Sequence, residues 1–238
     1  MTEEIFREDA YAQSCTASVV EADERGVILD STVFYAEGGG QPGDTGTFTT
    51  ADGTQIEVTG TYKDRDGRGI LHVLAEGETT PAAGTEVTAS IDWERRFQHM
   101  RMHSCLHLLC SLIDGGVTGG SIGVAKSRLD FDLQDVSLDK EVLTEELNRL
   151  VQENHALISS WITDDEMETQ QDLVRTMSVK PPSGEGRVRL MHVEGVDLQP
   201  CGGTHVKATG EIGAIRVSKI ENKGKHNRRV NIVFAEQD

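Results

Sequence analysis

Two histidines, His103 and His107, stand four residues apart in a segment of helical periodicity. Positions four apart lie on the same face of a helix, so both imidazoles can reach one ion. Much later in the chain, Cys201 and His205 stand in the segment CGGTH and add a thiolate and a third imidazole. This nitrogen and sulfur set is one that zinc prefers. Either pair alone would be weak, because histidine pairs on helices often only pack or hydrogen-bond. Together they predict a zinc site.

The neighbouring histidine His99 extends the stripe by one turn toward the N-terminus. The stripe drifts by about 40° every four residues, so we expect His99 to be an outer partner or a surface residue, and it is left out of the ligand set. The pattern also lacks the glutamate of H-E-x-x-H, which excludes a metalloprotease with its general base on this helix.

A second group of residues is the glycine-rich segment 34–46, FYAEGGGQPGDTG. Three consecutive glycines, Gly38 to Gly40, imply that another group approaches the backbone closely. The segment is not a phosphate-binding P-loop, because no G-K-[ST] follows. The residues alone leave two interpretations open: a β-bulge or barrel corner, or a wall of a substrate or RNA site.

Length and composition bound the class of protein. The chain has 238 residues, 37% of them hydrophobic, and its 25 glycines lower that share, so it can build a globular core. Four scattered cysteines do not form a disulfide framework in a chain of this length. No apolar run is long enough to cross a bilayer, and the start, MTEEIFREDA, has no signal-peptide pattern. We expect a soluble, cytoplasmic protein with no membrane partner.

The charge balance is strongly acidic, with 23 Lys and Arg against 40 Asp and Glu and a net charge of −17. This argues against nucleic-acid binding by the whole surface. Residues 216–230 differ: they hold six basic residues against Glu221, a net charge of +5, so the rest of the chain carries −22. Taken alone, this segment is better interpreted as a solvated hairpin. The other interpretation is a single place that admits a polyanion.

The first part of the chain is predicted to be β. Short strand-forming runs alternate with turn signals such as Asp52-Gly53 and Asp66-Gly67, which is typical of a small antiparallel barrel. The periodicity changes at Trp93, where a helix is predicted over 93–113. The predicted domains are a β-barrel with the glycine-rich motif at 1–91 and an α+β domain at 92–238, so the fold class is α+β.

The second domain is predicted to hold two long helices flanked by runs of strands. We expect a glycine-rich turn at 117–123, a strand at 127–133, a second helix from about Asp139, and a loop at 181–186. Three strands are then expected at 188–195, 211–220 and 228–235. The buried side of the second helix is predicted to hold Val142, Leu143, Leu147, Leu150, Val151, Leu157 and Ile158.

Several of these segments together resemble a known family. RMHSCLHLL (101–109), SRLDFD (127–132) and QPCGGTHVKATGEIGAIRVSKIENKGKHNRRV (199–230) are similar to the editing domain of alanyl-tRNA synthetase. With GGGQPGDTG (38–46), they most resemble its free-standing relatives, the medium-length AlaX trans-editing proteins. The resemblance extends from about Ser31 to Val233. It departs at Leu106, where the synthetase pattern usually has Thr, and at 117–123, where that pattern places a Gln.

The resemblance implies a barrel followed by a zinc-containing editing domain, like the second additional domain of threonyl- and alanyl-tRNA synthetases. It implies hydrolysis of the ester between serine or glycine and tRNA(Ala), with Zn²⁺ as cofactor and the aminoacylated tRNA as partner. The implied zinc ligands are His103, His107, Cys201 and His205.

Further roles are predicted around this site. Backbone donors of Gly202, Gly203 and Thr204 would form an oxyanion hole. The predicted substrate-binding residues are Thr32, Gly38, Gly39, Gly40, Gln41 and Asn227. The resemblance to the medium-length proteins implies that Thr32 and Asn227 recognise the seryl hydroxyl. The predicted tRNA-binding residues are Lys219, Lys223, Lys225, Arg228 and Arg229. Four protein ligands resemble a closed structural site, so the sequence leaves open whether zinc activates water or only positions the substrate. The terminal hydroxyl of the tRNA is a candidate general base.

Three hypotheses follow from the sequence. The favoured one is a zinc-dependent aminoacyl-tRNA deacylase. The second is a zinc-stabilised tRNA-binding module without turnover, and the third is a general zinc esterase for which the basic segment is accidental. The sequence makes no prediction of the oligomeric state.

Overall fold

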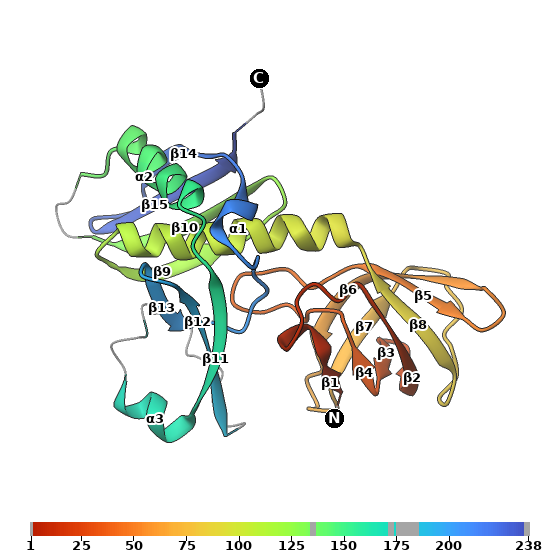
Figure 1. Cartoon of the computed structure of the whole chain (residues 1–238). Coiled ribbons are helices and arrows are strands. Elements are labelled where there is room, and N and C mark those ends of the chain that lie inside the picture. The colour runs from red at the N-terminus through yellow and green to blue at the C-terminus, as the bar shows by residue number, and fades with distance from the viewer. Residues whose placement is uncertain (1, 134–136, 171–173, 175–185, 236–238) are drawn as a thin grey trace. The chain divides into compact units, whose positions relative to one another are not determined.

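The computed structural model describes residues 2–133, 137–170, 174 and 186–235 (Figure 1). The chain divides into two compact units. Unit 1 consists of Met1–Gly38 and Pro42–Phe97, and unit 2 consists of Gly39–Gln41 and Gln98–Asp238. The helix α1 (Trp93–Leu112) contains the division, and it covers the predicted helical segment to within one residue. The domain ranges 1–91 and 92–238 stay a prediction.

Unit 1 is a closed barrel of six strands in the order β2-β3-β7-β6-β5-β8, with antiparallel neighbours. This confirms the small antiparallel barrel predicted from the sequence. A short parallel pair, β1 (Glu3–Glu4) with β4 (Ser31–Thr32), and the 3-10 helix η1 (Ile5–Arg7) accompany it. The barrel strands are β2 (Ser14–Asp23), β3 (Gly26–Leu29), β5 (Gly46–Thr50), β6 (Gln55–Lys63), β7 (Ile70–Leu74) and β8 (Glu86–Ile91).

The barrel forms because apolar and polar residues alternate along its strands. In β6, for example, Ile56 and Val58 are buried while Gln55, Glu57 and Thr59 are exposed. Closure of the sheet leaves no free edge in this set of strands. The buried apolar core consists of Ala17, Val19, Val27, Leu29, Val33, Phe34, Phe48, Ile56, Val58, Val87, Ala89 and Ile91.

A buried ion pair fixes the glycine-rich segment inside unit 1. Arg96, which is fully buried, donates from Nε to Oδ2 of Asp44 at 2.9 Å. Its two other nitrogens donate to the carbonyl oxygens of Ala10 at 2.9 Å and Val33 at 2.6 Å. Because the charge of Arg96 is paired and its donors are satisfied, burial of the guanidinium is tolerated. The carboxylate of Asp44 is therefore paired with Arg96 inside unit 1.

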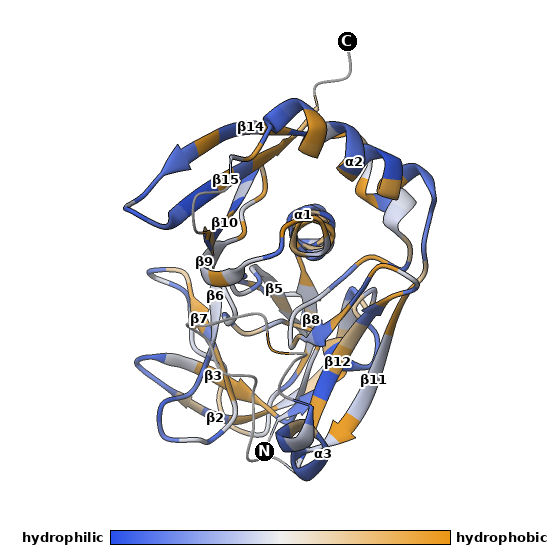
Figure 2. Ribbon diagram, turned by 90° about the vertical axis from the view of Figure 1, so that its left-hand side faces the viewer, coloured by the Kyte–Doolittle hydropathy of each residue, from blue (hydrophilic) through white to orange (hydrophobic). Residues whose placement is uncertain are grey.

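Unit 2 is α+β and contains two antiparallel sheets. The four-stranded sheet has the order β14-β15-β10-β9, and the three-stranded sheet has the order β11-β12-β13. The four-stranded sheet lies against α1, which Figure 2 shows end-on. The elements are β9 (Gly116–Ser121), β10 (Lys126–Asp132), α2 (Lys140–Gln152), β11 (Leu157–Thr163), α3 (Asp164–Thr169), β12 (Arg187–Val193), β13 (Asp197–Pro200), η3 (Thr209–Ile212), β14 (Ile215–Asn222) and β15 (Asn227–Phe234).

Helix α2 covers part of the outer edge of this sheet. The side chain of Asn148 donates to the carbonyl oxygen of Ile215 at 2.7 Å and accepts from the N–H of Ile215 at 3.1 Å. The hydroxyl of Thr144 accepts from the N–H of Val217 at 3.0 Å. Polar side chains of α2 thus satisfy backbone groups of the edge strand β14.

The structure corrects two details of the sequence interpretation and leaves a third untested. The segment 117–123, predicted as a turn, is mostly the strand β9, since its backbone pairs with β10. Residues 209–212 form the 3-10 helix η3, so the strand predicted at 211–220 begins later, at Ile215. The loop predicted at 181–186 lies outside the described residues except for its last residue, Gly186.

The predicted burial of the second helix was also partly wrong. Helix α2 ends at Gln152, and Asn154 then adopts a left-handed backbone conformation with φ of 55°. Leu157 and Ile158 therefore begin the strand β11, and Ile158 is 52% exposed. Val142 lies on the helix as predicted but is 55% exposed.

Among the described residues, no helix is both long and apolar enough to span a membrane.

Candidate functional site

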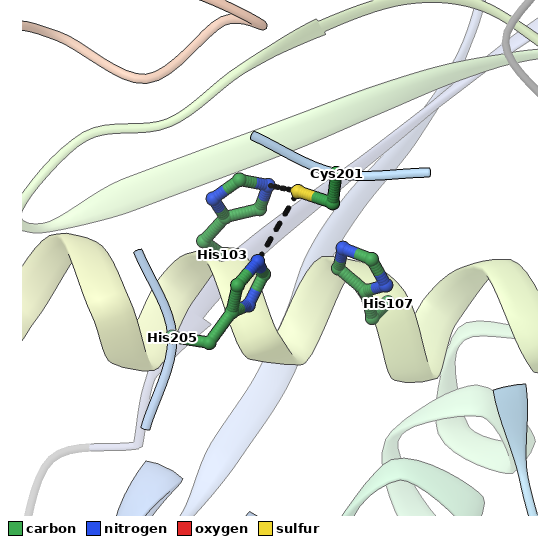
Figure 3. A group of neighbouring side chains, drawn as sticks. All are labelled: His103, His107, Cys201 and His205. Atoms are coloured by element: carbon green, nitrogen blue, oxygen red, sulfur yellow. Dashed lines mark hydrogen bonds between the residues drawn. The ribbon is translucent and has the colours of Figure 1, made fainter. Parts of the chain in front are cut away.

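Four side chains of unit 2 converge on one point (Figure 3). His103 and His107 lie on α1, and Cys201 and His205 lie in the segment that follows β13. One potential ligand atom from each residue lies within 4.8 Å of the others. Sγ of Cys201 lies 3.4 Å from Nε2 of His103 and 3.2 Å from Nε2 of His205. The structure thus brings together the four residues that were singled out as ligands, while His99 is buried but lies outside this group.

Each imidazole in the cluster has a different hydrogen-bond partner at its Nδ1 atom. Nδ1 of His103 lies 2.9 Å from Oε1 of Gln41, and Nδ1 of His107 lies 3.0 Å from Oδ2 of Asp197. The third ring has its Nδ1 atom 3.2 Å from the hydroxyl of Ser104. A proton on Nδ1 leaves Nε2 of the same ring free to bind a metal. In this tautomer, which a bound metal requires, each ring would direct the lone pair of Nε2 into the cluster.

The charges of the cluster favour a thiolate. Burial opposes ionisation of Cys201, but the imidazoles of His103 and His205 hold the pKa of this thiol well below its usual range. Burial also disfavours a charged His107, yet the hydrogen bond to Asp197 and the thiolate raise the pKa of that imidazole to about 9. Burial and the charge of His103 lower the pKa of His205. Binding of a metal cation by this cluster would therefore release the protons that its ligand atoms carry.

The donor set fits a tetrahedral zinc ion. Zinc bonds of about 2.0–2.1 Å to nitrogen and about 2.3 Å to sulfur place tetrahedral ligand atoms roughly 3.3–3.6 Å apart. The two Sγ–Nε2 separations, 3.2 and 3.4 Å, lie close to this range. The residues present can therefore hold a metal ion, and their types favour zinc over magnesium or calcium, which take oxygen ligands.

The segment Cys201–His205 is held by contacts that its glycines permit. A Cβ atom on Gly203 would lie 2.2 Å from Cε1 of His103, so only glycine fits against this ring. Nη1 of the buried Arg189 donates to the carbonyl oxygens of Gly203 at 2.8 Å and Cys201 at 3.3 Å. The N–H of Cys201 donates to the carbonyl oxygen of Arg189 at 3.0 Å. Arg189 therefore fixes the loop that carries the thiolate.

Two of the three predicted oxyanion donors are already engaged. The N–H of Thr204 donates to Oε1 of Gln41 at 3.1 Å, and the N–H of Gly203 lies 3.5 Å from Sγ of Cys201. Within the described part of the chain, no hydrogen bond occupies the N–H of Gly202. The oxyanion hole of Gly202, Gly203 and Thr204 stays a prediction, in which Gly202 is the residue with an unengaged N–H among the described residues.

The glycine-rich segment serves both units. Gly43 and Gly46 approach the barrel backbone so closely that a Cβ would lie 2.0 Å from the carbonyl oxygen of Thr61 or 2.1 Å from that of Ser90. By contrast, Gly39 and Gly40 belong to unit 2 and have φ angles of 58° and 83°. The close approaches of Gly43 and Gly46 agree with the barrel-corner interpretation. A substrate or RNA wall at Gly38 to Gly40 stays a prediction.

The remaining residues of this segment make contacts on either side of the division. The carbonyl oxygen of Gly40 accepts from the N–H of Ile122 at 2.9 Å. Gly38 belongs to unit 1, where its carbonyl oxygen accepts from the hydroxyl of Tyr35 at 2.8 Å. Gln41 belongs to unit 2 and contacts His103 and Thr204. Of the predicted substrate-binding residues, Gln41 is thus the one that touches a member of the cluster.

The other two predicted substrate-binding residues make different contacts. Thr32 lies in unit 1, is fully buried, and bonds His72 Nε2 at 2.9 Å while accepting from the N–H of Phe34 at 3.1 Å. These bonds engage its hydroxyl inside the unit. Asn227 lies on β15, where its Nδ2 donates to the hydroxyl of Thr118 at 3.2 Å, and its buried Oδ1 has no partner among the described residues.

The predicted tRNA-binding residues lie on the hairpin of β14 and β15, and acidic neighbours pair several of them. Lys219 and Lys223 share Glu221, at 3.1 and 3.4 Å. Arg229 makes two hydrogen bonds to Asp130, at 2.7 and 2.8 Å. The exposed side chain of Lys225 and the half-buried side chain of Arg228 complete the group. The hairpin is therefore less positive than its count of basic residues indicates.

Sequence reasoning missed the outer partners of the cluster. Asp197 is one of 40 acidic residues, and nothing in its local pattern distinguishes it from the others. Ser104 follows His103 directly, yet Ser within a helix is common and gave no signal. Arg189 lies in a strand whose pairing with the following segment only the fold reveals.

A closed six-stranded barrel and an α+β unit that buries a His₃Cys cluster define a two-unit protein with a candidate metal centre. Residues 4–95 match the family model for class II (A) tRNA synthetases. Residues 188–231, which include Cys201 and His205, match the second additional domain of threonyl- and alanyl-tRNA synthetases.

Full-length relatives give a sharper result. The chain is 36% identical to the alanyl-tRNA editing protein AlaX-M of Methanosarcina acetivorans, over 97% of this chain and 98% of that protein. It is 32% identical to the AlaX-M protein of Saccharolobus solfataricus, with the same coverage. The alanine–tRNA ligase of Pyrobaculum arsenaticum is 37% identical over 92% of this chain, but the match covers only 25% of that ligase. The chain belongs to the AlaX-M family of alanyl-tRNA editing proteins, as the resemblance in the sequence indicated.

Proposed function

We propose that this chain is a zinc-dependent deacylase that hydrolyses mischarged tRNA(Ala) in trans and so protects the fidelity of translation in the cytoplasm. Ser-tRNA(Ala) is the proposed substrate, with Gly-tRNA(Ala) as the second to test. The observation that carries the proposal is the His₃Cys cluster, whose three imidazoles are buried, in a chain whose full-length relatives are named alanyl-tRNA editing proteins.

The proposed zinc ligands are His103, His107, Cys201 and His205. When bound, zinc supplies positive charge that polarises an ester carbonyl and acidifies a nearby water. The chain's own residues keep this centre in shape: Asp197 orients His107, and Arg189 holds the loop of Cys201. We propose Gly202 as the backbone donor to the developing oxyanion, with Gly203 and Thr204 holding the loop around it.

Recognition of the tRNA is assigned to the hairpin of β14 and β15. Lys219, Lys223, Lys225, Arg228 and Arg229 would contact phosphates, which fixes orientation without reading sequence. The rest of the chain, with its charge of −22, would repel RNA elsewhere. The residues proposed to contact the substrate are Thr32, Gly38, Gly39, Gly40 and Asn227, whereas Gln41 contacts His103. The contacts of Thr32 inside unit 1 make it the weakest of these assignments.

A second candidate function rests on the number of donors. Four protein ligands fill a tetrahedral site, as in structural zinc centres, whereas catalytic centres keep one position open. On this observation the chain would be a zinc-stabilised tRNA-binding module without turnover.

The two candidates differ in turnover, so hydrolysis is the test. Release of serine from Ser-tRNA(Ala) and from a small seryl ester is measured with the wild type and Cys201→Ala, together with zinc content before and after chelation. Turnover of the tRNA alone, lost in Cys201→Ala and after chelation, supports the deacylase. Binding of tRNA without turnover supports the second candidate. Equal turnover of both substrates would contradict both and indicate a general esterase.

A further inference from the structure

Gln41 makes three hydrogen bonds to the two segments that carry the cluster. Its side chain is fully buried. Oε1 of Gln41 lies 2.9 Å from Nδ1 of His103 and accepts from the N–H of Thr204 at 3.1 Å. Nε2 of Gln41 donates to the hydroxyl of Thr204 at 2.8 Å. A single amide therefore joins the helix α1 to the loop between Cys201 and His205.

These bonds fix the orientation of the amide. The N–H of Thr204 can only donate, so the atom of Gln41 that faces it must be the oxygen. The same oxygen faces Nδ1 of His103, which must then carry a proton for a hydrogen bond to form. With its proton on Nδ1, His103 presents Nε2 to the cluster, where Sγ of Cys201 lies 3.4 Å away. The amide thus selects the tautomer of His103 that can bind a metal.

The backbone on both sides of Gln41 is tightly packed, which restricts the position of its side-chain amide. A Cβ on Gly203 would lie 2.9 Å from Oε1 of Gln41 as well as 2.2 Å from the ring of His103. The backbone that delivers Gln41 is pinned by the hydrogen bond from Ile122 to Gly40. Gly40 has a φ of 83°, and a Cβ there would lie 3.1 Å from the carbonyl oxygen of Gly120. The packing at Gly40 thus fixes the backbone that precedes Gln41, and the packing at Gly203 restricts the space next to its amide oxygen.

We infer that Gln41 is a positioning residue of the metal centre, which sets the tautomer of His103 and holds Thr204 so that the thiolate and the imidazoles face one ion. The inference rests on the metal centre of the proposed function and not on its substrate. It replaces direct contact with the aminoacyl group as the role of Gln41. Outer partners of this kind typically change metal affinity by about 10–100-fold.

The test compares two substitutions of Gln41. Gln41→Met keeps the volume and removes all three hydrogen bonds, so zinc affinity is expected to fall by about 10–100-fold. Gln41→Glu keeps two acceptor oxygens, and the hydroxyl of Thr204 can rotate to donate to the second one. The introduced carboxylate would act on the imidazole of His103 as Asp197 acts on His107, so Gln41→Glu is expected to retain at least the wild-type zinc affinity.

Zinc affinity is measured by competition with a chromogenic chelator, and thermal unfolding checks that each variant folds. Gln98→Met is the matched control, because Gln98 also lies on the ligand helix but its Oε1 bonds Arg101, which is not a ligand. A folded Gln41→Met with wild-type zinc affinity would overturn the inference. So would a raised KM for Ser-tRNA(Ala) with unchanged zinc affinity, since that result assigns Gln41 to substrate contact.

A measurement on the wild type keeps the inference testable if Gln41→Met fails to fold. In the zinc-loaded protein, ¹⁵N NMR is expected to show a proton on Nδ1 of His103 that exchanges slowly with solvent. A metal-bound Nδ1 in His103 would overturn the inference. If the wild type binds zinc but does not hydrolyse Ser-tRNA(Ala), the proposed function fails while the affinity test of Gln41 still decides this inference.

Discussion

Buried histidines occur in both units, and their surroundings differ in one decisive way. In unit 1, His72 is fully buried between Phe34 and Phe48, with ring centroids 5.2 and 5.3 Å away. Its Nδ1 bonds the carbonyl oxygen of Val27 at 3.0 Å and its Nε2 bonds the hydroxyl of Thr32 at 2.9 Å. Both nitrogens of this ring are therefore used inside the barrel.

In unit 2, the Nδ1 atoms of three buried histidines are similarly bonded, but their Nε2 atoms face a thiol and one another. Burial and an oriented tautomer are common to both regions. What marks the second region as a candidate metal centre is that, within the described ranges, no hydroxyl takes up the second nitrogen of each ring. In this chain, the buried histidines that indicate a metal site are those whose Nε2 atoms face other potential metal ligands.

The largest effect is expected from removing the thiolate. Cys201→Ala removes the negatively charged ligand and leaves three imidazoles. Zinc affinity should therefore fall by more than about 100-fold, which exceeds the loss expected when a hydrogen-bond partner of a ligand is removed. Zinc content after dialysis measures this. Cys15→Ala is the control, because Cys15 lies in unit 1 and is also half-buried. Full retention of zinc by Cys201→Ala would remove this residue from the ligand set.

A backbone substitution should act almost as strongly. In Gly203→Ala the new Cβ would lie 2.2 Å from Cε1 of His103, so the ring or the loop must move. We expect a loss of zinc affinity of about 100-fold, comparable to losing an outer partner at the upper end of its range. Gly119→Ala is the matched control, since its Cβ would make an ordinary contact of 3.5 Å with Asp130. Equal zinc affinity in both variants would show that the ring of His103 is not tightly placed.

Asp197→Asn should weaken the centre by about 10–100-fold. Against the effect of burial, Asp197 and Cys201 together raise the pKa of His107 to about 9 in the metal-free protein, so zinc must displace a proton below that pH. Wild-type affinity is therefore expected to rise as pH increases toward 9. In Asp197→Asn the imidazole of His107 holds its proton less tightly, so the rise of zinc affinity with pH should occur at lower pH. Calorimetric titrations with zinc at several pH values measure both effects, and identical pH profiles would contradict the role of Asp197.

The smallest effect concerns His72 and should leave zinc untouched. Burial lowers the pKa of His72 from 6.5 to about 4. The unfolded chain therefore binds this proton more tightly, and the contribution of His72 to stability is present above pH 6.5 and lost as pH falls toward 4. At about pH 5.5 the loss is about 1.4 kcal/mol.

Denaturant unfolding at about pH 7.5 and about pH 5.5 measures this change, with His72→Phe as the comparison. That variant lacks the titrating group, so it should lose less stability between the two pH values than the wild type. Zinc affinity at the higher pH should be equal in the two proteins. If the wild type and the variant showed the same pH dependence, burial would not lower the pKa of His72 in the folded chain.

The sequence was sufficient to predict the main fold and the four donors, for identifiable reasons. Strand alternation and Asp-Gly turns are local, so the barrel could be predicted, and the spacing of His103 and His107 follows from helix geometry. Their convergence with Cys201 and His205 could be inferred because three imidazoles and a thiolate are a chemically specific combination. The family resemblance connected the two distant segments.

Other features depend on the tertiary structure and could not be read from the sequence. The glycines of 117–123 favour a turn locally, yet pairing with β10 makes the segment a strand. The apolar spacing of α2 continues past Asn154, so Leu157 and Ile158 were placed on a helix that had already ended. Gln41 and Thr32 received the same predicted role, and only their contacts separate them.

The strand β14, one of the two outer strands of the four-stranded sheet, has a consequence for the behaviour of the chain at high concentration. An extra strand from a second molecule could pair with β14 only after displacing the side chains of Asn148 and Thr144 from its backbone. Farther along, Lys219 and Glu221 would have to be brought against the incoming chain. Crowded copies of this protein are therefore not expected to seed aggregates through this strand, and their contacts with one another must be sought on other surfaces.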